Sequence, residues 1–243
     1  MITSTDNPRV KEVVRWRKVR ERRRDGVLLA EGPREVQRAL ASGLVVRQLY
    51  VAPELLPEWP HGGDEVTARV LAKMSYRAEP EGVVAVFDVP RRELPQNPNL
   101  ILVAVGIEKP GNLGAMARTA DAAGADALLV AEAACDPWNP NAIRASTGAV
   151  FTLPILETTL ADIQTLPLQR VAAVVGLPRR HSDADLTPPT AIIVGAEDEG
   201  LRSEWRDAAD IQVSLAMHAR TVDSLNASTA AAILLYETLR QRG

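Results

Sequence analysis

From residue 100 onward, apolar runs alternate with segments of helical character, and this alternation constrains the fold more than any other feature. Leu100–Val105 is a continuous apolar run, residues 112–123 favour a helix that closes at Gly124, and Ala127–Ala131 is apolar again. Apolar strands separated by helices are typical of a parallel sheet covered on both faces. We therefore expect an α/β fold in the second half.

Further elements are expected on both sides of this region. In the first half these are a basic helix at 8–23, a strand at 27–30, a helix at 34–42 after a turn at Pro33, and extended or helical runs at 45–51, 66–76 and 83–89. In the second half they are a helix at 139–147, extended runs at 149–155 and 170–175, strands at 191–194 and 211–215, and a C-terminal helix. Strand–helix alternation also makes residues 1–90 a small α/β domain.

A polar, proline-bearing stretch without periodicity, residues 90–98, separates the two halves. Such stretches are typical of linkers between domains. We place the boundary near residue 97, which predicts a first domain at 1–97, including a basic N-terminal arm, and a second domain at 98–243.

The basic arm stands out because the chain as a whole is acidic, with a formal net charge of −3. Residues 1–24 hold nine Lys and Arg against three Asp and Glu. The planar guanidinium group suits phosphate oxygens, so Arg20, Arg22, Arg23 and Arg24 are candidate contacts for a nucleic acid. The alternative is a solvated helix face with excess charge.

Composition and residue spacing argue against a disulfide-rich, a membrane and a metal-binding protein. A single cysteine, Cys135, excludes a disulfide framework within the chain and fits a reducing cytoplasm. No apolar run approaches the length that spans a membrane, so we expect a cytoplasmic protein without a membrane partner. His61, His181 and His218 lie far apart in sequence and Cys135 has no partner at zinc-site spacing, so we expect no metal.

Polar residues gather where strands are expected to end, in the stretches 106–119, 192–201 and 217–228. Ligands of open α/β sheets bind at the carboxyl ends of the strands. The third stretch runs into the Ala/Leu-rich C-terminal helix, whose first N–H groups can bind side chains or a ligand. These stretches predict one site.

The first stretch alone also permits a dinucleotide site. Glycines lie between a strand and a helix, and Glu132 follows the next strand, where a ribose-binding carboxylate could lie. The glycine spacing departs from G-x-G-x-x-G, however, and there is no lysine–Ser/Thr pair of a phosphate-binding P-loop.

Together the three stretches resemble the motifs of the SpoU-type (TrmH-like) branch of the SPOUT RNA methyltransferases, over residues 100–240. The matching residues are Asn112-Leu113-Gly114 with Arg118-Thr119-Ala120 and Gly124, Val194-Gly195-Ala196-Glu197 with Gly200-Leu201, and Met217 with Ser224-Leu225-Asn226-Ala227-Ser228 and Leu235-Tyr236-Glu237. The segment Arg144-Ala145-Ser146 with Gly148 and Phe151 is similar as well. Residues 28–36 and 80–86 resemble the ribosomal-protein-like substrate-binding domain of many such enzymes.

The resemblance implies methyl transfer from S-adenosylmethionine to a ribose 2′-hydroxyl of RNA, with 23S-type ribosomal RNA as the expected partner. It also implies a trefoil knot in the C-terminal domain and a homodimer formed through that domain. One departure bears on the tight cofactor-binding turn: Ala216 and Ala219 stand where the family has Pro and Gly.

Transferred residue by residue, the resemblance predicts a site in three parts. The catalytic candidates are Asn112, Arg118, Glu197, Ser224 and Asn226. The cofactor-binding candidates are Val194, Gly195, Ala196, Gly200, Leu215, Met217, Leu225, Asn226 and Ser228. The RNA-binding candidates are Arg34 and Arg144, from the segments that resemble the family, together with Arg20, Arg22, Arg23 and Arg24 of the basic arm.

Several roles stay open at this stage. Arg118 either activates the ribose hydroxyl or binds the target phosphate and stabilises developing negative charge, and a guanidinium is a poor base near neutrality. Asn112, Ser224 and Asn226 are also good helix caps. Glu197 is either a site residue or a solvated loop acid, and His218 is a proton acceptor or an incidental loop histidine.

Two other functions compete with the methyltransferase. One is a non-catalytic RNA-binding or ribosome-assembly factor on the same scaffold. The other is a dinucleotide-dependent oxidoreductase. Binding of S-adenosylmethionine or of NAD separates the three.

Overall fold

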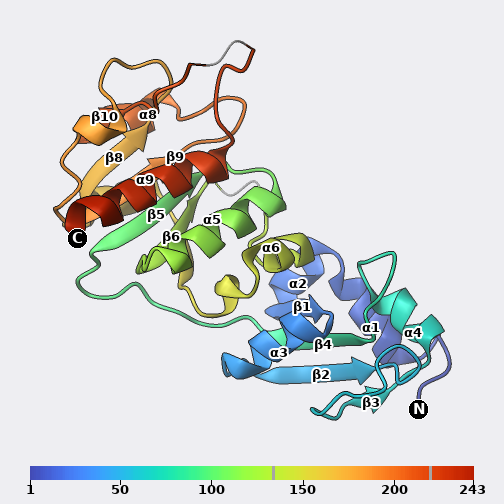
Figure 1. Cartoon of the computed structure of the whole chain (residues 1–243). Helices are drawn as coiled ribbons and strands as arrows, with labels where there is room; N and C mark the ends of the chain where they lie inside the picture. Colours follow the sequence, from blue (N-terminus) through green and yellow to red (C-terminus); the bar gives the residue numbers. More distant parts are fainter. Residues whose placement is uncertain (133–134, 219–220) are drawn as a thin grey trace. The chain divides into compact units, whose positions relative to one another are not determined.

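The computed structural model covers the whole chain and describes residues 1–132, 135–218 and 221–243 (Figure 1). The chain forms two compact units. Unit 1 comprises Met1–Arg91 and Trp138–Thr152, and unit 2 comprises Arg92–Pro137 and Leu153–Gly243. The predicted boundary near residue 97 lies a few residues beyond Arg91. A single boundary does not describe the units fully, because Trp138–Thr152 also belongs to unit 1.

Unit 1 is built on a four-stranded mixed sheet in the order β1-β4-β2-β3. Strand β4 pairs antiparallel with both β1 and β2, and β2 pairs parallel with β3. Its strands are β1 (Val27–Glu31), β2 (Val46–Val51), β3 (Asp64–Glu65) and β4 (Val83–Asp88), and its helices are α1 (Pro8–Trp16), α2 (Val19–Asp25), α3 (Pro33–Ala41), α4 (Ala68–Met74) and α6 (Pro140–Ser146). The core gathers side chains from α1, α4 and the sheet, including Val13, Trp16, Leu29, Val70 and Val86.

The single helix expected at 8–23 is wrong, because α1 ends at Trp16 and α2 begins at Val19. Lys18 is extended at the break, with φ −85° and ψ 130°. Trp16 is buried and its indole N–H donates to Asp25 at 2.7 Å, so α2 folds back on α1. The buried Arg22 then donates to the carbonyls of Trp16 and Arg17 at the end of α1, at 3.0 and 2.9 Å.

The extended run expected at 149–155 is also wrong in its first part. Ala149–Phe151 is a 3-10 turn that follows α6, and β7 begins at Ile155. Thr147 and Gly148 both have positive φ angles, 52° and 95°, which turn the chain sharply before Ala149. The turn buries Phe151 in unit 1 instead of extending it along a sheet.

Unit 2 contains a six-stranded sheet in the order β10-β8-β9-β5-β6-β7, and every pairing in it is parallel. The strands are β5 (Leu100–Val105), β6 (Ala127–Ala131), β7 (Ile155–Thr158), β8 (Gln169–Ala173), β9 (Thr190–Val194) and β10 (Ile211–Val213). The predicted α/β fold with a parallel sheet is confirmed. The trefoil knot stays a prediction.

Helices cover both faces of this sheet. α5 (Pro110–Ala122) and α9 (Ala227–Arg242) lie side by side on one face (Figure 1). The other face packs against Ile163 of α7 (Leu160–Thr165) and Trp205 of α8 (Ser203–Asp207). α7 and α8 are not among the predicted elements, because they are too short to show a helical period.

No helix in the described part of the chain is both long enough and apolar enough to cross a membrane. Among the same residues, no group of three or more His, Cys, Asp or Glu side chains is placed to hold a metal ion.

Candidate functional site

The loop after β9 is folded tightly back on itself. Gly200 N–H donates to the carbonyl of Ala196 at 3.0 Å, and the two residues form an isolated β-bridge. A Cβ on Gly195 would lie 2.3 Å from the carbonyl carbon of Gly200, so only glycine permits this approach. Gly200 has a φ of 66°, in the region that glycine adopts at little cost.

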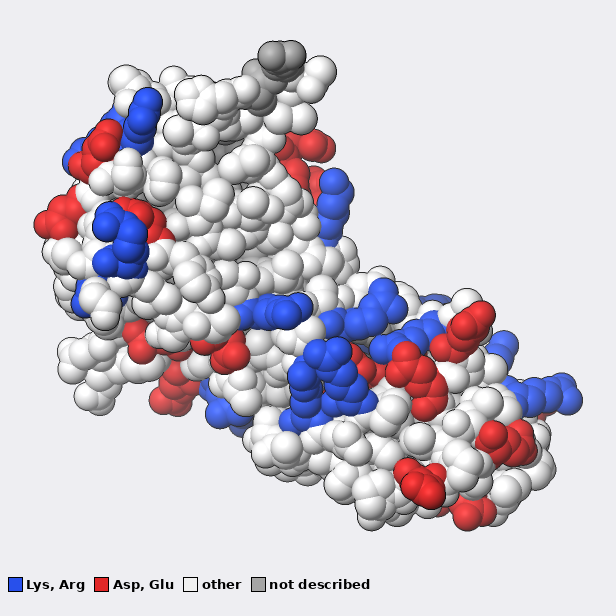
Figure 2. Space-filling model, in the orientation of Figure 1, with Lys and Arg blue, Asp and Glu red and all other residues white. Residues whose placement is uncertain are grey.

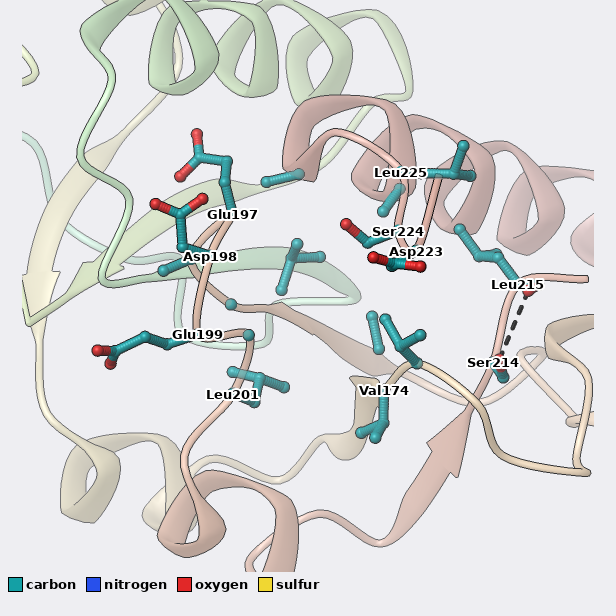
Figure 3. A pocket seen from close by; sticks show the side chains of 18 of the residues that line it. Val174, Glu197, Asp198, Glu199, Leu201, Ser214, Leu215, Asp223, Ser224 and Leu225 are labelled. Carbon is teal, nitrogen blue, oxygen red and sulfur yellow. Dashed lines mark hydrogen bonds between the residues drawn. The ribbon is translucent and has the colours of Figure 1, made fainter. Parts of the chain in front are cut away.

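This loop forms one wall of a pocket of about 380 Å³ at the carboxyl ends of β8, β9 and β10 (Figure 3). The opposite wall is the segment before α9, with Asp223, Ser224 and Leu225. Aliphatic side chains such as Val174 and Leu201 line the base. Pockets of a few hundred Å³ with apolar walls and a few polar groups suit nucleoside-sized ligands.

Three predicted catalytic residues form a hydrogen-bonded chain in unit 2. The Asn226 side-chain amide donates to Asn112 Oδ1 at 3.1 Å, and the Asn112 amide donates to the Glu197 carboxylate. Each residue comes from a different one of the three polar stretches. The stretches therefore meet in space, as their positions at strand ends predict.

The network also answers which residues act as helix caps. α5 begins at Pro110 after Lys109, so Asn112 lies within the first turn and its side chain bonds across to other loops. Asn226 is the N-cap of α9, and its Oδ1 accepts from the N–H groups of Ser228 and Thr229 at 2.9 and 3.4 Å. One Asn226 side chain thus caps a helix and holds Asn112.

The predicted site residues fall into two sets. The residues that line the pocket are Val194, Gly195, Ala196, Glu197, Gly200, Leu215, Met217, Ser224 and Leu225. Outside that lining are Asn112, Arg118, Asn226 and Ser228. His218 is exposed and also outside it, while Ala219 lies outside the described residues.

Arg118 is exposed on α5, and no hydrogen bond or ion pair engages it among the described residues. Its side chain is therefore available to a ligand from solution. Its role stays a prediction.

The predicted RNA-binding arginines belong to unit 1, where Lys and Arg side chains gather over α2 and its surroundings (Figure 2). Arg20, Arg23, Arg34 and Arg144 are exposed. Arg24 is exposed but paired with Glu21 and Asp25, at 2.7 and 2.9 Å. The prediction for Arg22 is wrong, because this side chain is only 1% exposed and is used within the unit.

Glu132 does not suit the ribose-binding role of the dinucleotide alternative. Its carboxylate accepts from Trp205 Nε1 at 2.8 Å and from Arg202. Burial alone would raise the pKa of Glu132, but these two donors outweigh it and hold the pKa below its usual value. The carboxylate thus serves as an acceptor for α8 and its preceding loop.

Several residues that line the pocket are not among the candidates predicted from the sequence. Ala173, Val174 and Val175 at the end of β8 line it, as does Asp223 next to the predicted Ser224. The signal for β8 was weak because its apolar run is short. Asp223 was readable only as part of the polar stretch before α9.

Two known protein families match parts of this chain. The SpoU rRNA Methylase family matches residues 99–236, more than half of the chain. The chain belongs to the SpoU rRNA methylase family. An MRM3-like substrate binding domain matches residues 7–85, so the resemblances inferred for both halves are confirmed.

Individual SpoU relatives support the assignment along the whole chain. A 23S rRNA (uridine(2479)-2′-O)-methyltransferase of Streptomyces viridochromogenes is 35% identical over 233 residues, which cover 88% of this chain and 76% of the relative. A crystal structure of an RNA 2′-O ribose methyltransferase is 44% identical, with a TM-score of 0.86 and coverage of 99% and 98%. An AdoMet-bound rRNA methyltransferase from Sinorhizobium meliloti is 28% identical, with a TM-score of 0.87 and coverage of 98% and 97%.

The pocket fits the SpoU family's cofactor, S-adenosylmethionine. Val174, Leu215 and Leu225 offer aliphatic surface for an adenine ring. The close approach of Gly195 to Gly200 holds the loop after β9 in the conformation that forms one wall of the pocket. Carboxylates at the rim, including Asp223, complement a positively charged donor.

Proposed function

We propose that the protein transfers a methyl group from S-adenosylmethionine, bound in the pocket of unit 2, to a ribose 2′-hydroxyl of ribosomal RNA. The observation that carries the assignment of the site is the Asn226–Asn112–Glu197 chain of hydrogen bonds beside this pocket. It joins all three motifs at the carboxyl ends of the parallel strands, where α/β proteins bind their ligands.

S-adenosylmethionine supplies an activated methyl group on a sulfonium, so the protein's task is mainly to align the acceptor oxygen with it. Alignment of this kind can lower a barrier by roughly 7–11 kcal/mol at best. Asn226 is fixed by capping α9, and through Asn112 it fixes Glu197 and the loop after β9. The network therefore keeps the two walls of the pocket in register.

We assign Arg118 to the acceptor and not to the donor. Its side chain is exposed on α5 and is not part of the pocket lining. Because a guanidinium stays protonated in proteins, Arg118 is suited to binding the target phosphate or stabilising charge on the acceptor oxygen.

Unit 1 is proposed to hold the RNA through phosphates. Arg20, Arg23, Arg34 and Arg144 offer exposed guanidinium groups, and the match to a substrate binding domain covers most of the unit. Each phosphate contact removed should reduce the salt slope of binding by about one. Arg20→Ala with Arg34→Ala should therefore flatten the slope by about two, and an unchanged slope assigns both residues to solvation.

We further propose 23S-type ribosomal RNA as the substrate, a cytoplasmic location and a homodimer formed through unit 2. The substrate proposal is supported by the relative from Streptomyces viridochromogenes, a 23S rRNA 2′-O-methyltransferase. Sedimentation of the purified protein tests the dimer.

The function is tested in two steps. Calorimetric titration should show binding of S-adenosylmethionine and no binding of NAD. Mapping of 2′-O-methylation on total RNA, from cells with and without the protein, should reveal one ribose whose modification is lost. Donor binding without any lost modification would favour a non-catalytic RNA-binding factor.

A further inference from the structure

The donor pocket carries an excess of negative charge. Among the described residues that line it, four are carboxylates and one is a guanidinium: Glu197, Asp198, Glu199 and Asp223 against Arg206. A concave site lined by one sign of charge concentrates ligands of the opposite sign. This pocket is therefore suited to a cation.

The four carboxylates are not equivalent. Glu197 accepts from Asn112, which fixes its direction. Glu199 interacts electrostatically with Arg202, and its carboxylate, like that of Asp198, points away from the cavity in Figure 3. Asp223 instead lies across the cavity from the loop after β9, beside Ser224 (Figure 3).

Asp223 is exposed, and within the described residues no hydrogen bond or ion pair engages it. Asp223 also lines a second depression, together with Arg180 and His218. Asp223 thus lines both hollows, and its carboxylate has no hydrogen-bond or ion-pair partner in the described part of the chain.

Resting on the proposed function, we infer that Asp223 is the residue by which this pocket distinguishes the methyl donor from the spent product. The donor carries a positive sulfonium, whereas the product S-adenosylhomocysteine carries a neutral thioether. The two ligands share the adenosine and the amino-acid group, so contacts to those parts favour both equally. A carboxylate facing the cavity can attract the α-ammonium of both ligands, but its attraction to the sulfonium exists only for the donor.

This discrimination has a consequence for turnover. Once the methyl group leaves, the sulfur becomes a neutral thioether, and the attraction between the sulfur and Asp223 ends. The product is then held less tightly than the donor, which favours its exchange. Because Asp223 is exposed, salt should screen the effect over a Debye length of about 10 Å at 0.1 M.

The test is the ratio of two dissociation constants, measured by calorimetry at low salt on the full chain. Asp223→Asn should lower the preference for S-adenosylmethionine over S-adenosylhomocysteine by about 3- to 10-fold, as expected for one partly screened charge pair. The loss should fall on the donor, with the product's affinity changed less than twofold. An analogue with a protonated amine in place of the sulfonium should follow the donor.

Glu199→Gln is the matched control, since it removes a carboxylate of the same pocket that points away from the cavity. It should change the ratio less than twofold. Equal weakening of donor and product in Asp223→Asn, or no change in either, overturns the inference. A wild-type protein that binds neither ligand refutes the proposed function instead, so the two failures are distinguishable.

Discussion

Replacing Gly195 by alanine tests the structure of the donor pocket directly. The added Cβ would lie 2.3 Å from the carbonyl carbon of Gly200, 2.4 Å from its oxygen and 2.5 Å from the nitrogen of Leu201. All three are main-chain atoms, so no side-chain rotation can relieve the clash. The loop must move away from β9 by about 1 Å to restore ordinary contact distances near 3.4 Å.

That movement has two costs. Overpacking of a close-packed site costs about 1–3 kcal/mol. Opening the loop also weakens the bond from Gly200 N–H to the Ala196 carbonyl, 3.0 Å long, which is worth about 1 kcal/mol. We therefore expect Gly195→Ala to lose about 2–4 kcal/mol of unfolding free energy and to weaken donor binding at least tenfold.

Gly111→Ala is the matched control. Gly111 lies in the first turn of α5, and a Cβ there meets nothing within 4 Å. This variant should gain up to about 1 kcal/mol from helix propensity and bind the donor within twofold of wild type. Urea unfolding and calorimetric titration measure both quantities. Wild-type stability and donor affinity in Gly195→Ala would refute the reasoning.

Three further variants test other parts of the structure. Asn112→Ala removes the two side-chain hydrogen bonds that link the walls of the pocket, so kcat/KM should fall about 10- to 100-fold. An unchanged kcat/KM would show that this hydrogen-bond network does not contribute to catalysis. Arg22→Ala should lower the free energy of unfolding in urea by about 2–3 kcal/mol, because the carbonyls of Trp16 and Arg17 lose their donor. The control Arg20→Ala should change it by no more than about 0.5 kcal/mol, and equal losses in the two variants would contradict the buried placement of Arg22. Arg240 and Gln241 donate to the Glu237 carboxylate and hold its pKa at about 2, below its usual 4.5. The stabilisation that Glu237 gives to the folded state is therefore present above pH 4.5 and is lost as the pH falls through 2. The gap in unfolding free energy between wild type and Glu237→Gln should close over that range, and a constant gap contradicts the ion pair.

The parallel sheet of unit 2 could be predicted because its strands are apolar on both faces. Leu100–Val105 and Ala127–Ala131 are strands with the bounds expected from sequence, since burial on both sides leaves a continuous apolar run. The N-cap of the last helix, α9, could also be predicted, because it depends on residues that are close in sequence. Asn226 precedes a long Ala/Leu-rich segment and caps it through its own side chain.

Features that depend on contacts formed only when the chain folds could not be predicted in this way. Arg22 belongs to a run of arginines that suggests a solvated face, and only the fold-back of α2 on α1 buries it. Asn112 looks like a helix cap, but Pro110 begins the helix earlier and releases its side chain for Glu197 and Asn226.

By itself the sequence determined the class of sheet, the strand ends that carry polar motifs and the family, because these depend on patterns within a few residues of one another. Only the tertiary structure decided which of those polar groups meet. Asn112 and Asn226 are 114 residues apart and follow strands β5 and β10, which are not neighbours in the sheet. Their contact exists because α5 and α9, which begin close to these residues, pack against each other on one face of the sheet.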